Sequence, residues 1–174
     1  MEAAERKAAE EALRESQEKL LQTSRLAGMA EVAAQGFSDD RFAGARAAFE
    51  AALTYARQRE SFGKPIIEHQ AVNFRLADMA VKVEAAHQMM VKAARLKDSG
   101  QRNDLEAGMA KYLASEYCKE VVEDSFRIHG GYGYSKEYEI ERLYREAPML
   151  LIGEGTADIQ RMIIGRRLLE DYKR

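Results

Sequence analysis

Apolar side chains recur along most of this chain at intervals of three and four residues, which is the spacing of one face of an α-helix. The pattern predicts a helix over about 39–59, longer helices over about 68–98 and 104–128, and a last helix that begins after residue 156. No segment sustains a two-residue alternation, which would indicate a β-strand. The expected core positions are Phe42, Ala45, Phe49, Leu53, Ala56, Phe74, Leu76, Met79, Val83, Met90, Ala94, Leu96, Met109, Tyr112, Leu113, Tyr117, Val121, Val122, Phe126, Ile159, Met162, Ile163 and Leu169.

Turn and cap residues separate these expected helices. Gly36 is expected to end a first helix, and Ser38 is a suitable N-cap for the next. Gly63 and Pro65 end that helix, and Ser99-Gly100 ends the third. The pattern therefore predicts an all-α fold, an antiparallel four-helix-type bundle with an additional long N-terminal helix.

The later boundaries also follow from local chemistry. Asn103 and Glu106 have the spacing of a capping box at the start of the fourth helix. After His129-Gly130-Gly131 breaks that helix, a short helix is expected around 137–145. Thr156 is the expected N-cap of the last helix, with Asp158 in its first turn.

The segment before residue 36 is rich in strong helix formers and predicts a long helix over 2–35. Leu13, Leu20 and Ala27 recur every seven residues, which gives a thin heptad seam. Two interpretations stay open, a coiled coil and a solvated helix that lies on the rest of the domain. We expect residues 1–31 to form this N-terminal or dimerisation segment and residues 32–174 to form the bundle.

Composition narrows the class of protein. The 174 residues carry 27 Lys and Arg against 29 Asp and Glu, a net charge of -2, which argues against a nucleic-acid partner. The sequence has no apolar run long enough to span a membrane and begins without the apolar core of a secretory signal, so we expect a cytoplasmic protein. One cysteine and three scattered histidines disfavour a disulfide framework or a metal site.

Candidate chemistry lies where helical patterning stops. These regions are Arg59–Pro65, His129–Tyr134 and Gly153–Thr156. Glycine permits close approach of a ligand to the backbone, and the N-terminus of the last helix suits an anion such as pyrophosphate.

Three segments carry a family resemblance: ARQRESFGKPIIEHQAVNFRLADMA (56–80), FRIHGGYGYSKEYEIERLYREA (126–147) and GEGTADIQRMIIGRRLLEDYK (153–173). Together they make residues of about 32–173 resemble the C-terminal helical domain of the flavin-dependent acyl-CoA dehydrogenases. The resemblance implies a four-helix bundle, pairing of subunits into a dimer or tetramer, and FAD across the dimer interface. It also implies oxidation of acyl-CoA to trans-2-enoyl-CoA, with an electron-transferring flavoprotein as the acceptor of the electrons.

The resemblance also implies roles for single residues. Glu154 matches the catalytic base, which must lie near the α-carbon and away from water. The FAD-binding positions that match are Arg59, Ser61, Phe62, Gln70, Gly130, Gly131 and Thr156. A structural alternative stands beside each: a surface turn for the first three, a solvated helix residue for Gln70, a helix C-cap for the glycines and an N-cap for Thr156.

Two further arginines are candidates to bind the phosphates of CoA. No motif places Arg102 or Arg166 at the substrate, and solvated surface charge is the favoured interpretation for both. The chain also departs from the family, because Arg127 stands where a glutamine is usual, which puts one FAD contact in doubt.

The N-terminal part of the chain departs further. The family's N-terminal helical domain and β domain are absent from this sequence, and residues of about 12–33 resemble the dimerisation helix of sensor histidine kinases. Ser38 stands where that family has its phospho-accepting histidine, so phosphotransfer is not implied.

Two function classes follow. In the first, the chain is an FAD-binding module of a dehydrogenase, and it is inactive alone because it lacks the domains that shield the flavin. In the second, it is a non-catalytic oligomerisation or assembly module, formed by a natural or engineered fusion.

Overall fold

The computed structural model describes residues 38–172 of the chain, with the side chains of residues 42–170 and 172. Five α-helices make up most of this part: α2 (Ser38–Gln58), α3 (Gln70–Asp98), α4 (Asp104–His129), α5 (Glu139–Ile152) and α6 (Ala157–Tyr172). Two 3₁₀-helices, η2 (Ile66–Glu68) and η3 (Gly130–Tyr134), lie in the connections. The predicted all-α class is confirmed.

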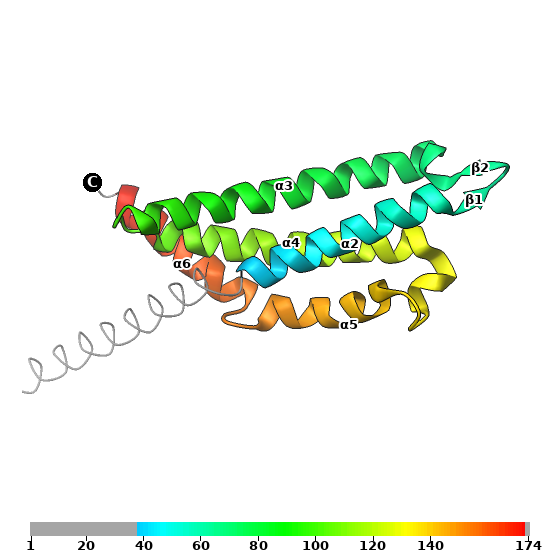
Figure 1. Cartoon of the computed structure of the whole chain (residues 1–174). Helices are drawn as coiled ribbons and strands as arrows, with labels where there is room; N and C mark the ends of the chain where they lie inside the picture. Colours follow the sequence, from blue (N-terminus) through cyan, green and yellow to red (C-terminus); the bar gives the residue numbers. More distant parts are fainter. Residues whose placement is uncertain (1–37, 173–174) are drawn as a thin grey trace, which may run out of the picture.

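The helices form an antiparallel bundle with α4 at its centre (Figure 1). α4 packs against α2, α3, α5 and α6, and α2 also contacts α3 and α5. The short connection at residues 99–103 reverses the chain between α3 and α4, whereas after residues 153–156 helix α6 continues in the general direction of α5, antiparallel to α4 (Figure 1). As a result, the end of α2 and the end of α4 lie at one end of the bundle, and the end of α5 lies at the other.

Small side chains bring the two central helices together. Ala45, Ala48, Ala52 and Ala56 repeat along one face of α2, and each is at most 1% exposed. A Cβ built on Gly44 would lie 3.4 Å from the Cys118 sulfur of α4, so α2 and α4 are in close contact there. Dispersion between such closely packed backbones, added to apolar burial, stabilises the bundle.

A two-stranded hairpin connects α2 to α3, although no strand was expected. Strands β1 (Glu60–Ser61) and β2 (Lys64–Pro65) pair antiparallel, with Ser61 opposite Lys64. The two turn residues, Phe62 and Gly63, have φ of 51° and 79°. Positive φ at both positions is the geometry of a tight hairpin turn, which glycine adopts without strain and phenylalanine does not.

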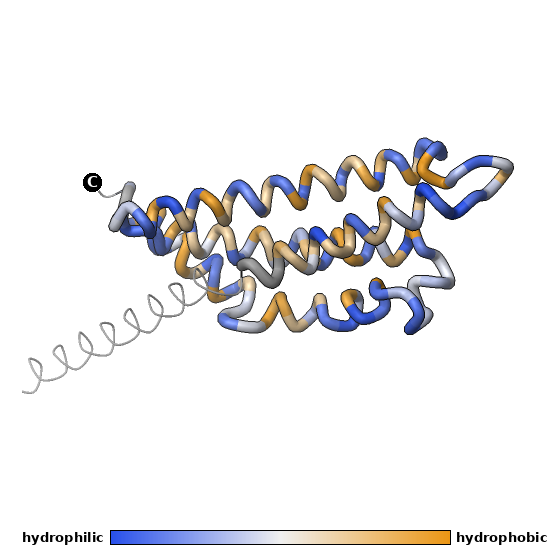
Figure 2. Tube along the Cα trace, viewed as in Figure 1, coloured by the Kyte–Doolittle hydropathy of each residue, from blue (hydrophilic) through white to orange (hydrophobic). Residues whose placement is uncertain are grey.

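Several predicted details are wrong. Phe74 is 60% exposed, because it lies two residues, or about 200° of helical rotation, from the buried Leu76. Met162 and Leu169 are 47% and 64% exposed, while the buried face of α6 holds Gln160 and Ile163. Figure 2 shows how polar and apolar positions alternate along each helix.

Two predicted boundaries are also corrected. The Asn103 side chain makes no cap hydrogen bond to α4 but donates from Nδ2 to the Ala93 oxygen at 3.2 Å, so the capping box does not form. The short helix expected at 137–145 is α5, which continues through Pro148 to Ile152. The predictions on residues 1–37, the N-terminal helix and its heptad seam among them, lie outside the described residues.

Candidate functional site

The end of α2 and the hairpin after it gather several of the predicted cofactor residues. Arg59 follows the last residue of α2, and its backbone N–H donates to the Tyr55 oxygen at 2.8 Å. Phe62, at the tip of the hairpin, is 97% exposed. Gln70 begins α3 and is exposed.

His69 fixes the conformation of this hairpin. Its Nε2 lies 3.2 Å from the Ser61 carbonyl oxygen and 3.0 Å from Ser61 Oγ. Because a carbonyl only accepts, Nε2 carries a proton and donates to it. The His69 ring also meets the Phe62 ring edge to face, with 6.1 Å between the centroids. A histidine that sequence analysis did not select therefore holds two of the predicted residues in place.

The end of α4 forms the facing wall. Gly130, with φ of 57°, is the C-cap of α4, which confirms the structural alternative for this glycine. His129 is 4% exposed, donates from Nδ1 to the Ser125 oxygen at 2.8 Å and stacks on Tyr55 with 4.4 Å between ring centroids. Burial lowers the pKa of His129, which keeps the imidazole neutral near pH 7. Burial also raises the pKa of Tyr55.

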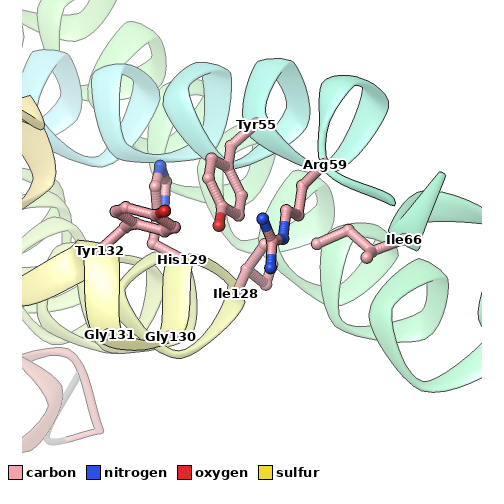
Figure 3. A pocket seen from close by; sticks show the side chains of 8 residues that line it. All are labelled: Tyr55, Arg59, Ile66, Ile128, His129, Gly130, Gly131 and Tyr132. Carbon is pink, nitrogen blue, oxygen red and sulfur yellow. The ribbon is translucent and has the colours of Figure 1, made fainter. Parts of the chain in front are cut away.

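An open cleft of about 540 Å³ lies between these walls, as Figure 3 shows. The guanidinium of Arg59 lies 5.9 Å from the centre of the Tyr132 ring. The cleft is lined by Tyr55, Arg59, Ile66, Ile128, His129, Gly130, Gly131 and Tyr132. This lining contains a cation, aromatic faces and exposed glycine backbone but no carboxylate, a combination that suits an anionic, aromatic ligand.

Glu154 lies in the connection between α5 and α6. It has φ of 55°, a left-handed conformation that is strained for any residue except glycine, and Gly155 follows with φ of 100°. Thr156 caps α6, because its Oγ1 accepts from the Ile159 N–H at 3.4 Å, as predicted. Glu154 is half-buried, which is the partial shielding that a general base requires.

Glu154 and the cleft lie far apart along α4. Lys111 of α4 contacts the Glu154 connection, and His129 of α4 lines the cleft. These two residues are 18 positions apart on one helix, or about 27 Å at 1.5 Å per residue. A single chain therefore does not bring Glu154 and Arg59 together.

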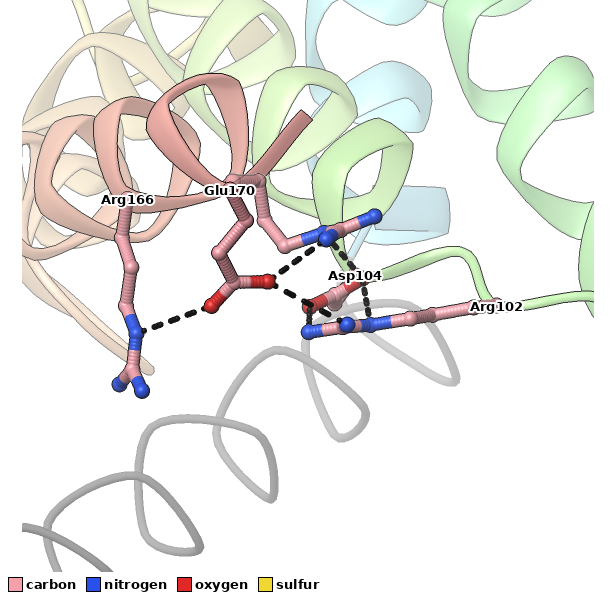
Figure 4. A network of polar contacts seen from close by, with 5 residues as sticks. Arg102, Asp104, Arg166 and Glu170 are labelled. Carbon is pink, nitrogen blue, oxygen red and sulfur yellow. Dashed lines mark hydrogen bonds and ion pairs between the residues drawn. The ribbon is translucent and has the colours of Figure 1, made fainter. Parts of the chain in front are cut away.

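The two candidate CoA-binding arginines, Arg102 and Arg166, both contact Glu170. Arg102 pairs with Asp104 at 2.7 Å and reaches Glu170 at 3.4 Å, and Arg166 contacts Glu170 at 3.3 Å (Figure 4). Arg167, 13% exposed, pairs with Asp104 at 3.2 Å in the same cluster. The pairs of Arg102 with Glu170 and of Arg167 with Asp104 join the start of α4 to α6, whereas the Arg166 pair lies within α6.

Neither a cluster of metal-binding side chains nor a membrane-spanning helix is found in the described part of the chain. Among residues 38–172 no group of three or more His, Cys, Asp or Glu side chains could hold a metal ion. Within the same residues, no helix combines the length and the apolar character needed to cross a membrane.

Comparison with protein families decides the class. Residues 40–169 match the acyl-CoA dehydrogenase C-terminal domain family. The chain belongs to this family. Its structure is similar to butyryl-CoA dehydrogenase of Megasphaera elsdenii, with a TM-score of 0.80, 37% identity, and coverage of 83% of this chain and 37% of the other.

Related sequences agree with this assignment. The chain is 48% identical over 126 residues to a probable acyl-CoA dehydrogenase, YngJ, of Bacillus subtilis, covering 72% of this chain and 33% of the relative. It is 47% identical over 126 residues to 3-(aryl)acrylate reductase of Clostridium sporogenes, with the same coverage. The acyl-CoA dehydrogenase-like chain thus spans about a third of the length of the curated relatives it matches. The resemblance of residues 12–33 to histidine kinases lies outside the matched range and stays a prediction.

Proposed function

We propose that this chain is the C-terminal module of an FAD-dependent acyl-CoA dehydrogenase, and that its Arg59 cleft holds the adenosine diphosphate half of an FAD carried by a second subunit. The observation that carries the proposal is the lining of the cleft. Arg59, the exposed backbone of Gly131 and three aromatic rings surround it without a carboxylate. Guanidinium groups bind phosphates through paired hydrogen bonds, and aromatic faces accept an adenine.

The residues around the cleft fit this ligand. A Cβ built on Gly131 meets nothing within 4 Å, so the backbone there is open to a ligand. Among the described residues Arg59 has no carboxylate within ion-pair distance, which leaves its charge available to phosphates. Near the cleft lie the other candidate residues, Ser61, Phe62 and Gln70. Phe62 is exposed and can contact a neighbouring subunit.

Arg127 stands where the family usually has a glutamine, but its side chain does not reach the cleft. Its guanidinium pairs with Glu123 at 2.6 Å, and it is not among the residues that line the cleft. We therefore assign it no contact to FAD.

Glu154 is the proposed base of the reaction. FAD, when bound, supplies an acceptor for the hydride that leaves the β-carbon of the acyl thioester. Glu154, as a carboxylate, takes the proton from the α-carbon, so that the carbon–carbon double bond of the enoyl-CoA forms as both C–H bonds break. Half-burial of Glu154 keeps water from competing for this proton. Thr156, two residues later, supplies a hydroxyl at the N-terminus of α6, where an anionic group is favoured.

Separation of Arg59 and Glu154 supports a homo-oligomer. Each chain offers the two at ends about 27 Å apart along α4, so an FAD bound at the Arg59 cleft is served by the Glu154 of another chain. Exposed apolar side chains on α5 and α6 supply surface for such an association. They are Met149, Ile152, Met162, Leu168, Leu169 and Tyr172.

We also propose that the 174-residue chain alone does not oxidise acyl-CoA. The part that matches covers 33% of a relative such as YngJ, and α-proton abstraction needs a flavin ring that is shielded from water. An electron-transferring flavoprotein is the proposed electron partner of the complete enzyme. The name of one relative, subunit CarC of the caffeyl-CoA reductase-Etf complex of Acetobacterium woodii, supports this choice.

Ligand competition tests the cleft. FAD is titrated into the 174-residue chain by calorimetry, with ADP and FMN as competitors. We expect FAD and ADP to bind and to compete, and FMN, which lacks the adenosine half, to bind at least tenfold more weakly. Arg59→Ala removes a charge-assisted contact of about 1.5–3 kcal/mol and should weaken both FAD and ADP about 10- to 100-fold.

A matched control is Arg57→Ala, an exposed arginine of the last turn of α2 that does not line the cleft. This variant should bind FAD as the unmodified chain does. Equal affinity for FAD and FMN, or an Arg59→Ala variant that binds ADP normally, would contradict the proposal. In that case the bundle acts as an assembly module only.

A further inference from the structure

The connection that carries Glu154 is held by two buried polar side chains from different helices. The Lys111 ammonium of α4 donates to the Leu151 oxygen at 3.4 Å and to the Gly155 oxygen at 2.5 Å. The Gln160 amide of α6 donates to the oxygen of Glu154 itself at 3.4 Å. Hydrogen bonds from the interior therefore reach the backbone before, at and after Glu154.

Burial makes the lysine informative. Lys111 has no exposed surface, and Lys is rarely fully buried unless hydrogen bonds or charges compensate it. Its neighbours on the same face of α4 are small, Ala107, Ala114 and Ser115, so the side chain lies among them and not in solvent. A methionine would fill this space without the cost of dehydrating an ammonium, and the hydrogen bonds of Lys111 offset that cost.

Gln160 contacts both α4 and the Glu154 connection. It also has no exposed surface, and it reaches α4 over Gly108. A Cβ built on Gly108 would lie 3.5 Å from the Gln160 carboxamide oxygen and 3.4 Å from the Ile164 side chain. The glycine thus allows α6 to approach α4 closely, which buries the Gln160 side chain between the two helices.

These contacts explain how a strained backbone persists. Glu154 and Gly155 both have positive φ, and a non-glycine residue in that region is maintained only where its surroundings determine it. We propose that Lys111 and Gln160 are positioning residues that hold Glu154 in its left-handed conformation and so fix the direction of its carboxylate. This inference rests on the proposed role of Glu154 as the base.

The proposed positioning acts through the backbone of the connection. Lys111 donates to the Leu151 and Gly155 oxygens and Gln160 to the Glu154 oxygen, so these contacts act on carbonyl groups at and beside Glu154. With the donors removed, the turn relaxes toward negative φ, and the Cα–Cβ bond of Glu154 changes direction. A base displaced by about 1 Å loses much of its effect on proton abstraction.

The test follows the connection in the complete 174-residue chain. Lys111→Met keeps the length and burial of the side chain but removes the donor. Two readouts are used: the ¹³C resonance of the Glu154 carboxyl carbon, assigned by its loss in Glu154→Gln, and hydrogen exchange of the Gly153 and Gln160 backbone amides. These amides donate to Met149 and Thr156 and flank the connection on both sides.

We expect Lys111→Met to shift the Glu154 resonance toward that of an exposed glutamate and to speed exchange at Gly153 and Gln160 about tenfold. Val121→Ala is the matched control, since Val121 is a fully buried residue of the same helix that contributes to the core. It should lower thermal stability without moving either readout, which separates positioning from general packing.

Gln160→Met provides a second variant with no change of charge, and it should move the same two signals. Unchanged signals in both variants, or equal changes in Val121→Ala, would overturn the inference. FAD titration of Lys111→Met keeps this result separate from the proposed function, because the cleft lies about 27 Å away along α4. Weak FAD binding by every form counts against the cleft, whereas an unmoved Glu154 signal counts against Lys111 and Gln160.

Discussion

Single glycines determine how closely backbones approach one another at the two candidate regions. Gly133 is buried beneath the cleft, and a Cβ built on it would lie 2.9 Å from the Phe126 oxygen. Gly131, two residues earlier, is exposed and meets nothing within 4 Å. These two glycines of the same 3₁₀-helix therefore differ: Gly133 is a packing residue, and Gly131 lies open at the surface of the cleft.

Alanine substitution should separate these roles. Gly133→Ala forces a methyl group against backbone, and overpacking of this kind destabilises a protein by about 1–3 kcal/mol. Gly131→Ala should leave the free energy of unfolding nearly unchanged and weaken FAD binding. Denaturant unfolding of both variants provides the measurement, and equal destabilisation by the two would show that Gly131 is also a packing residue.

His129 gives the cleft a defined dependence on pH. Burial lowers its pKa from the ordinary value of 6.5, so the unfolded chain binds a proton more readily than the folded protein does. The contribution of His129 to stability is therefore complete above pH 6.5 and is lost as pH falls from 6.5 through the folded-state pKa.

His129→Phe removes this titration and keeps an aromatic ring against Tyr55. The difference in unfolding free energy between the unmodified protein and His129→Phe should decrease between about pH 7.5 and about pH 5.5. Urea unfolding at both pH values measures it. A difference that is constant over this range would mean that His129 takes up its proton as readily in the folded protein as in the unfolded chain.

At the scale of elements, an ion cluster holds α6 against the start of α4. Asp104, 19% exposed, receives Arg102 at 2.7 Å and Arg167 at 3.2 Å, and Arg167 also contacts Glu170 at 2.7 Å. Partly buried networks of this kind stabilise more than isolated surface pairs do. Arg102, which also reaches Glu170 at 3.4 Å, is part of this connection between α4 and α6.

Removal of the central carboxylate tests the cluster. Asp104→Asn should lower the free energy of unfolding by about 1–3 kcal/mol, because it removes a carboxylate that pairs with the partly buried Arg167. The matched control is Asp158→Asn in the exposed pair with Arg161, where the aspartate is 88% exposed. That change should be below about 0.5 kcal/mol. Equal losses in thermal unfolding would show that the cluster behaves as ordinary surface charge.

The elements also show what the sequence could predict. Helical periodicity and the Thr156 cap depend on local chemistry, and the structure agrees with both. Asn103 fails as a capping residue because its amide finds the Ala93 oxygen on α3, a partner that only the folded chain supplies. α5 passes Pro148 because packing of Ile140, Leu143 and Ala147 offsets the missing hydrogen bond.

Some candidate site residues can be identified from the sequence, and others only from the structure. Family motifs select Glu154, Arg59 and Gly131, but their separation along α4 depends on the topology of the bundle. Lys111 was missed because a lysine is ordinarily assigned to solvent. Its position four residues after Ala107 and four before Ser115, on an otherwise small and buried face, is the signal that identifies it.

At the scale of the whole molecule, the central claim is that FAD requires two chains. The Arg59 cleft and Glu154 of one chain lie about 27 Å apart along α4. Exposed apolar side chains of α5 and α6 offer surface for association. An oligomer therefore has a definite function in this account, since it brings the cleft of one chain to the base of another.

Sedimentation of the purified 174-residue chain with FAD, followed at both the protein and the flavin absorption bands, tests this claim most directly. The account predicts that flavin sediments with a particle of at least twice the 19.6 kDa mass of the chain, and that Arg59→Ala loses the flavin band. Flavin that sediments with a 19.6 kDa monomer, or with no protein at all, would contradict it.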